Sequence, residues 1–174
     1  MFVQSNSLRA IKTYFSKELL DLYSDNEIKQ IVKSLVVNRL KTIDLDYILS
    51  SNLKFSESDL LYFRTVLNRL RNQEPFQYVL GEVEFYDLRL KVDARALVPR
   101  PETEELVQWV LEDNININKS KKLIDLCSGS GCIGITIYKE NKNMDVTLSD
   151  VSEKALEICN KNKIKLASNV KTIK

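Results

Sequence analysis

A glycine-rich segment, Asp125 to Gly134, constrains the fold of this chain more than any other feature of its sequence. It follows a short apolar run, Leu123 to Leu126, that predicts a buried strand, and it leads into a helical pattern from Cys132 to Glu140. Asp145 to Leu148 then predicts a second strand, and Ser152 to Lys163 a second helix. Because strand and helix alternate, we predict a parallel sheet with right-handed crossovers.

The glycine loop suits an anionic or strongly polar ligand group. Glycines allow positive φ angles and a close approach to the backbone, and the first turn of the next helix offers free N–H groups. Asp150 ends the second strand, sixteen positions beyond Gly134, where such sheets place a carboxylate beside a ribose. The order of these features favours a nucleotide-type cofactor over a bare tight turn. NAD and S-adenosylmethionine both fit this arrangement.

The amino-terminal part of the chain has a different period. Apolar residues recur at helical spacing at Leu8, Ile11, Phe15, Leu19 and Leu22, at Ile28, Ile31, Leu35 and Leu40, and at Leu60, Phe63, Leu67 and Leu70. Ser56 to Asp59 has the pattern of a capping box that opens the third helix, and a shorter helix is expected around Asp44 to Leu49. We predict a small all-α bundle over residues 1–75.

A change of period marks the next segment, residues 76–101, as a hairpin and linker. Pro75 ends the helical region, because proline pushes the preceding residue out of helical geometry. Apolar residues then alternate from Val83 to Val92 on either side of Tyr86 and Asp87, which predicts a β-hairpin. Pro99 to Pro101 stiffens the chain that follows it.

Residues 102–174 are predicted to form the third part of the chain. Glu102 to Leu111 is expected as a helix with acidic residues at its favourable amino end. An asparagine-rich linker, Asn114 to Asn118, separates this helix from the first parallel strand, and Val170 to Ile173 is expected to begin a third strand. The predicted fold class is therefore α/β, with an all-α bundle ahead of an incomplete parallel sheet.

Composition removes several classes of site. The chain contains no histidine, which excludes histidine-based triads, histidine metal sites and imidazole switches. Cys127, Cys132 and Cys159 form no metal-like pair, so we expect free thiols, a cytoplasmic location and no metal. No apolar run approaches the ~20 residues that cross a bilayer. The formal net charge is +2, and we interpret the lysine-rich tail as a solvated helix face without direct contact to nucleic acid.

Three motifs carry a resemblance to a known family. Glu74 to Tyr86 is similar to the segment that joins the two domains of the release factor glutamine methyltransferases, the HemK/PrmC family. Val98-Pro-Arg-Pro-Glu-Thr-Glu104 resembles that family's Pro-Arg-Pro-acid-Thr-Glu signature. Asp125 to Gly131, followed by Asp150, resembles its cofactor loop and ribose acid. About half of the chain carries these motifs.

The resemblance implies both a fold and an activity. The fold is a helical domain that recognises a protein substrate, a β-hairpin linker, and the first part of a Rossmann-like class I methyltransferase sheet. The implied activity uses S-adenosylmethionine to methylate a side-chain amide nitrogen in class 1 peptide chain release factors. The target is the glutamine of their Gly-Gly-Gln motif.

The resemblance also assigns residues to the cofactor. Those that would line the methionine end of S-adenosylmethionine are Cys127, Ser128, Gly129, Ser130 and Gly131. Asp150 would hold the ribose, and Arg100 and Thr103 would border the same pocket. A salt bridge from Arg100 to Glu102 or Glu104 explains that arginine equally well.

Two departures from the family pattern bear on activity. The family holds its substrate amide with Asn-Pro-Pro-Tyr, but the prolines of this chain are Pro75, Pro99 and Pro101, so we assign no catalytic residue. We therefore expect an inactive amino-terminal fragment whose cut sheet has an unpaired edge and uncovered apolar faces. Cys127 stands where the family often has glycine, and a positive φ there would cost roughly 1 kcal/mol.

Two other functions compete with this interpretation. The spacing of Gly129, Gly131 and Gly134, together with Asp150, also fits an NAD-type dinucleotide-binding oxidoreductase. The missing amide-binding motif fits a non-catalytic module that binds release factors. The Pro-Arg-Pro segment has no counterpart in dinucleotide dehydrogenases, which ranks methyl transfer above hydride transfer.

Overall fold

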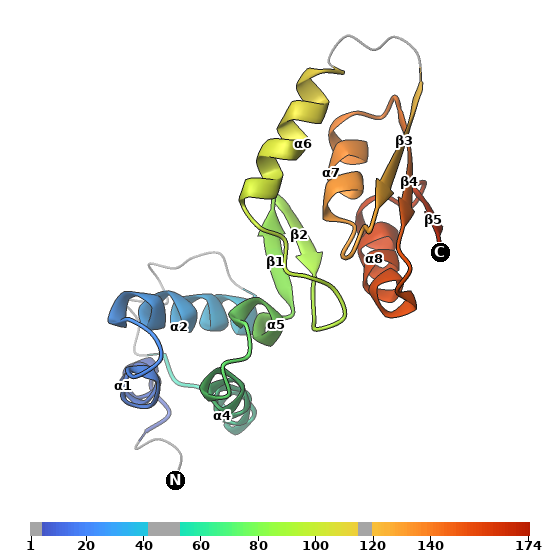
Figure 1. The fold of residues 1–174 in the computed structure, drawn as a ribbon. Coiled ribbons are helices and arrows are strands. Elements are labelled where there is room, and N and C mark those ends of the chain that lie inside the picture. Colours follow the sequence, from blue (N-terminus) through green and yellow to red (C-terminus); the bar gives the residue numbers. More distant parts are fainter. Residues whose placement is uncertain (1–4, 42–52, 115–119) are drawn as a thin grey trace. The chain divides into compact units, whose positions relative to one another are not determined.

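The computed structural model describes residues 5–41, 53–114 and 120–174 (Figure 1). The chain divides into an amino-terminal unit, Met1–Leu80, and a carboxy-terminal unit, Gly81–Lys174. The division falls five residues after the position that the sequence suggested. The short helix expected around residues 44–49 and the linker residues 115–118 lie outside the described residues.

The amino-terminal unit is helical, as the apolar spacing predicts. Its helices are α1 (Leu8–Leu19), α2 (Asp25–Leu40), α4 (Glu57–Arg71) and α5 (Phe76–Leu80). Ser24 with Glu27 and Ser56 with Asp59 form capping boxes at the starts of α2 and α4, which satisfy N–H groups that a helix leaves free. Leu22 was wrongly assigned to the first apolar face, because α1 ends at Leu19.

Aromatic packing fills the centre of this unit. The ring of Phe63 meets those of Phe15 and Phe55 edge to face, with centroid separations of 6.4 and 5.1 Å. All three side chains are buried, so α1, α4 and the segment before α4 share one core.

Pro75 does not end the helical region, contrary to the sequence interpretation. Helix α4 already ends at Arg71, and Pro75 precedes the short helix α5, whose Val79 amide donates to the Pro75 carbonyl at 3.1 Å. Proline is tolerated at a helix start because no N–H donor is needed there. Arg69 fixes this turn, because its guanidinium donates hydrogen bonds to both carboxylate oxygens of Glu74, at 2.7 and 2.5 Å.

The carboxy-terminal unit begins with the expected hairpin, formed by β1 (Glu82–Phe85) and β2 (Leu88–Lys91). Tyr86 and Asp87 connect the strands with φ angles of 47° and 61°, the pattern of a type I′ turn. Helix α6 (Glu102–Glu112) follows, and the Glu104 carboxylate accepts a hydrogen bond from the Tyr86 amide at 3.0 Å. The acidic signature segment thus ties α6 to the hairpin turn.

The predicted parallel sheet is also present. It contains β3 (Lys121–Leu126), β4 (Met144–Ser149) and β5 (Lys171–Ile173) in that spatial order, connected by α7 (Cys132–Glu140) and α8 (Glu153–Leu166). Because the strand order does not reverse, right-handed crossovers place both helices on the same face, as Figure 1 shows. The α/β fold class, with its helical bundle, hairpin and partial sheet, is confirmed.

One face of the sheet is packed and the other is open within the described residues. Met144, Val146 and Leu148 of β4 are buried toward the helices. On β3, however, Ile124 and Leu126 are 54% and 67% exposed, so the prediction of a buried strand was wrong for its outer face. The expectation of an uncovered apolar face is confirmed.

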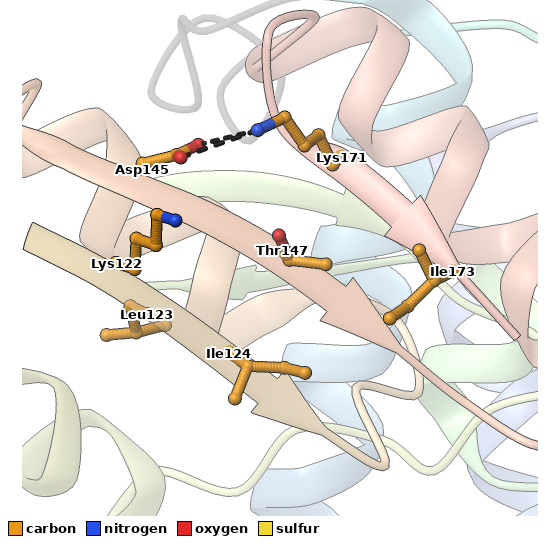
Figure 2. A pocket seen from close by; sticks show the side chains of 7 residues that line it. All are labelled: Lys122, Leu123, Ile124, Asp145, Thr147, Lys171 and Ile173. Carbon is orange, nitrogen blue, oxygen red and sulfur yellow. Dashed lines mark hydrogen bonds and ion pairs between the residues drawn. The ribbon is translucent and has the colours of Figure 1, made fainter.

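The open face contains a shallow hollow of ≈ 380 Å³, shown in Figure 2. Its lining residues come from all three strands: Lys122, Leu123, Ile124, Asp145, Thr147, Lys171 and Ile173. Lys171 and Asp145 form an ion pair at 3.2 Å at its border. Among the described helices, none combines the length and apolar character that a membrane span requires.

Candidate cofactor site

The loop between β3 and α7 bends through three positive φ angles. These are 59° at Cys127, 55° at Gly129 and 81° at Gly131. Glycine adopts such angles without steric cost, whereas a residue with a Cβ atom pays about 1 kcal/mol or more. Cys127 therefore has the positive φ angle considered from the sequence, in a conformation that favours glycine.

Hydrogen bonds hold the loop against the carboxyl end of β4. The Ser128 amide donates to the Ser149 carbonyl at 2.9 Å, and the Gly131 amide donates to the Ser128 carbonyl at 2.7 Å. The Gly129 amide donates to the Asp150 carboxylate, also at 2.9 Å. The loop is thus a built turn whose shape depends on the neighbouring strand.

Asp150 has a structural role in addition to the ribose contact predicted for it. One of its carboxylate oxygens accepts the Gly129 amide, and the other accepts the Ser152 amide at 2.9 Å. A carboxylate oxygen has a second lone pair, so each remains able to accept a hydroxyl group. The half-buried Asp150 lies where β4 meets the loop, the position that a ribose acid requires.

Asp125 is a second acid at this loop, and the sequence reasoning did not assign it a role. It is 7% exposed, and its carboxyl accepts a hydrogen bond from the Gly134 amide at 2.9 Å. Gly134 lies in the first turn of α7, whose cap residue Gly131 has no side chain to serve that amide. Burial, with a smaller contribution from the charge of Asp150, raises the pKa of Asp125.

The serines of the loop point inward. Ser128 and Ser130 are 6% and 2% exposed, and the Ser128 hydroxyl lies 3.9 Å from the thiol of Cys159 on α8. Cys127 is exposed and Gly129 is half-buried. A ligand above this loop would therefore meet its backbone and Cys127 more readily than the serine side chains.

Two glycines of this region also have close side-chain neighbours. A Cβ atom on Gly131 would lie 2.8 Å from Ile135 and 3.0 Å from the Cys159 sulfur. A Cβ atom on Gly134 would collide with Leu148 of β4. The second of these glycines lets helix α7 lie directly on the sheet, which brings its first turn to the strand ends.

Two of the thiols, those of the buried Cys159 and the half-buried Cys132, are chemically quiet. Burial is the main cause that raises the pKa of Cys132 and of Cys159 to about 11 each. A neutral thiol is a poor nucleophile and metal ligand. No group of three or more metal-binding side chains occurs among the described residues.

Arg100 and Thr103 lie at the start of α6. Arg100 is exposed, and its carbonyl accepts the Thr103 amide at 3.0 Å. None of the ion pairs between described residues includes Arg100, so the alternative of a salt bridge to Glu102 or Glu104 finds no support there. No hydrogen bond within the described chain joins either residue to the glycine loop, so their place beside the cofactor stays a prediction.

Comparisons with known proteins find similarity to methyltransferases. Residues 105–174 match the family model of the methyltransferase small domain. The release factor glutamine methyltransferase of Flavobacterium psychrophilum is 38% identical over 161 residues, which cover 90% of this chain and 56% of that protein. The protein of the same name from Bacteroides thetaiotaomicron is 31% identical, with coverages of 94% and 58%. Over most of its length, the chain is similar to the release factor glutamine methyltransferases.

The chain spans a little more than half the length of these two relatives. A third protein of this name, from Lactococcus lactis, is 43% identical over 109 residues, or 63% of this chain and 40% of that protein. Among solved structures, a coclaurine N-methyltransferase bound to N-methylheliamine and SAH matches this chain. The match covers 95% of this chain and 48% of that protein. It has 18% identity and a TM-score of 0.36.

Proposed function

We propose that this chain binds S-adenosylmethionine for the methylation of a glutamine side chain in class 1 peptide chain release factors. The target is the amide nitrogen of the glutamine in their Gly-Gly-Gln motif. Similarity to the release factor glutamine methyltransferases supports the reaction, and the loop between β3 and α7 supports the cofactor.

The observation that carries this proposal is the pair of acids at the loop. Asp125 binds the first turn of α7, and Asp150 binds the Gly129 amide. A dinucleotide would bring its pyrophosphate anion to the helix start, where a carboxyl group already occupies the Gly134 N–H. A sulfonium nucleoside brings a positive charge, which favours a site with carboxylates. The electrostatics therefore favour S-adenosylmethionine over NAD.

S-adenosylmethionine supplies an electrophilic methyl group when it is bound. The role of this chain is to hold the nucleoside: Asp150 would accept ribose hydroxyls, and the backbone of Cys127 to Gly131 would border the methionine end. A carboxamide nitrogen is a poor nucleophile, so it must be aligned with the methyl group and its N–H groups must be bound. The Asn-Pro-Pro-Tyr motif that resemblance associates with this task does not occur in the 174 residues.

We assign the protein contacts to the amino-terminal unit. Its four described helices form a core separate from that of the carboxy-terminal unit. A release factor as substrate agrees with a cytoplasmic location. In this proposal the helical unit recognises the factor, and the glycine loop presents the cofactor.

Calorimetry on the 174-residue chain tests the cofactor. We expect S-adenosylmethionine and S-adenosylhomocysteine to bind and NADH not to bind. Tighter binding of NADH would overturn the proposal in favour of a dinucleotide-dependent oxidoreductase.

A methyl transfer assay tests the reaction. Radiolabelled S-adenosylmethionine and a class 1 release factor are incubated either with this chain or with a version extended by its downstream coding sequence. We expect transfer to the glutamine with the extended version alone. Full turnover by the 174 residues would show that transfer does not need the Asn-Pro-Pro-Tyr motif, and would refute this expectation. Release factor binding without transfer by either version would favour a non-catalytic module.

A further inference from the structure

The carboxamide of Asn162 joins three segments of the carboxy-terminal unit that lie far apart in sequence. Asn162 is on α8 and is fully buried. Its oxygen accepts the Lys91 amide at 2.6 Å, and its nitrogen donates to the Lys91 carbonyl at 2.9 Å. The same nitrogen donates to the Ser130 carbonyl, also at 2.9 Å. One side chain thus binds the hairpin and the glycine loop together.

The contact with Lys91 takes the place of a neighbouring strand. Lys91 ends β2 and lies opposite Glu82 in the antiparallel register. Residue pairs in an antiparallel hairpin alternate between hydrogen-bonded and non-hydrogen-bonded pairs. Counting from the hydrogen-bonded pair Phe85–Leu88 beside the turn, the pair of Glu82 and Lys91 is non-hydrogen-bonded, so the backbone N–H and C=O of Lys91 point away from β1. Asn162 binds the outward N–H and C=O groups of Lys91, as the backbone of a third strand would. The hairpin edge is thereby fixed to α8.

The contact with Ser130 sets the direction of a loop peptide. In a trans peptide the C=O and the following N–H point in opposite directions. With the Ser130 carbonyl bound to Asn162, the Gly131 amide faces the other way, where it donates to the Ser128 carbonyl at 2.7 Å. Cys159, three residues earlier on α8, packs against the same loop beside Ser128. Helix α8 therefore supports the loop with two buried side chains.

We propose that Asn162 is a positioning residue that holds the glycine loop in its cofactor-binding conformation. The inference rests on the proposed cofactor site, although Asn162 itself is not assigned a contact with the ligand. Gly129 and Gly131 give the free loop access to many conformations, and without the hydrogen bond from Asn162 to Ser130 more of the ordering of the loop would be left to the ligand. Ordering a segment during binding lowers affinity, so the role of Asn162 is visible in the dissociation constant.

The test uses the full 174-residue chain and a matched control on the same helix. Asn160 is half-buried on α8, and its side-chain oxygen accepts the Thr172 hydroxyl at 2.9 Å, away from the loop. Calorimetry with S-adenosylhomocysteine is carried out on the wild type, N162A and N160A. We expect N162A to weaken binding at least tenfold and N160A to change it less than twofold.

Amide hydrogen exchange supplies a readout that does not depend on the ligand. The Lys91 and Gly131 amides should be protected in the wild type and in N160A. In N162A both should lose at least tenfold in protection, while the amides of α4 stay unchanged. If the wild type binds no nucleoside, the cofactor proposal fails, and these two amides still decide whether Asn162 holds the loop.

N162D keeps the test decisive if N162A does not fold. The ionised carboxylate of N162D would still accept the Lys91 amide but could donate to neither carbonyl, whereas the protonated carboxyl would donate to one of them. We expect N162D to bind S-adenosylhomocysteine more tightly at pH 5 than at pH 8, relative to the wild type at each pH. An N162A chain that folds and binds like N160A, or a pH-independent ratio for N162D, would overturn the proposal.

Discussion

The Gly129 amide donates a hydrogen bond to the Asp150 carboxylate at 2.9 Å, so the proposed ribose acid is also an anchor of the glycine loop. Its other oxygen accepts the Ser152 amide at the start of α8. One carboxylate therefore connects the loop, the end of β4 and the next helix. Substitutions of Asp150 remove structural contacts as well as the proposed ligand contact.

D150A is expected to weaken S-adenosylhomocysteine binding by roughly 30-fold, or about 2 kcal/mol, because hydrogen bonds to a charged group are lost. D150N keeps one acceptor oxygen and should lose roughly half of that free energy. D145N is the control, since Asp145 lies on the same strand β4 but pairs with Lys171 on the open face. Isothermal titration calorimetry measures all three. Equal affinity in D150A and D145N would remove Asp150 from the site.

Replacing Cys127 by glycine should stabilise the chain. Cys127 has a φ angle of 59°, so C127G relieves a steric cost of about 1 kcal/mol, of which part is offset by the greater freedom of glycine when unfolded. C127A keeps the Cβ atom and removes the thiol, and it should match the wild type. Urea unfolding compares the three chains. A gain in C127A as large as that in C127G would locate the effect in the thiol instead of the backbone.

The three thiols should differ in reactivity. Cys127 is exposed, whereas burial raises the pKa of Cys132 and Cys159 to about 11. At pH 8 iodoacetamide should therefore modify Cys127 first, and the other two only after unfolding in urea. Mass spectrometry of peptides gives the order. Added S-adenosylhomocysteine should slow the modification of Cys127, and rapid labelling of Cys159 in the folded chain would contradict the described packing.

The Arg69–Glu74 ion pair predicts a pH dependence of stability. The hydrogen bonds from Arg69 are the main cause that lowers the pKa of Glu74 from its ordinary value of 4.5. The carboxylate therefore stabilises the folded unit above that pH, and its contribution is lost as the pH falls through the lowered pKa. Both side chains are partly exposed, so E74Q should cost only about 0.5–1 kcal/mol at pH 7.

Urea unfolding of E74Q and wild type at pH 7 and pH 3 measures this effect. The difference between them should shrink at the lower pH, where the wild-type carboxyl is increasingly protonated. D21N serves as a control in the same unit, because Asp21 is exposed and lies beyond the end of α1. A difference that is constant between the two pH values would show that Glu74 acts through packing and not through its charge.

Local sequence patterns were sufficient for much of the fold. The alternation from Val83 to Val92 predicted the hairpin, and the structure closes it with positive φ angles at Tyr86 and Asp87. The span from Cys132 to Glu140 was predicted as a helix and is α7. These features depend on a few consecutive residues, so one sequence contains the information that specifies them.

The errors arose where side-chain contacts outside the apolar pattern decide the local structure. The apolar run of β3 predicted burial, but which strand face is covered depends on α7 and α8, and Ile124 faces the open side. Pro75 predicted an end to the helices, whereas Arg69 binds Glu74 and the helix α5 follows. Packing between distant elements determined the first outcome, and an ion pair between side chains five residues apart accompanies the second.

By itself the sequence determined the order of elements, the glycine loop and the acid at the end of β4, because backbone preferences and apolar periods are local. Only the tertiary structure placed Asp125 against α7 and Asn162 between β2 and the loop. A buried asparagine gives no periodic signal, since its hydrogen-bond partners lie 71 and 32 positions away along the chain. Those partners exist only after the hairpin and the sheet have packed around α8.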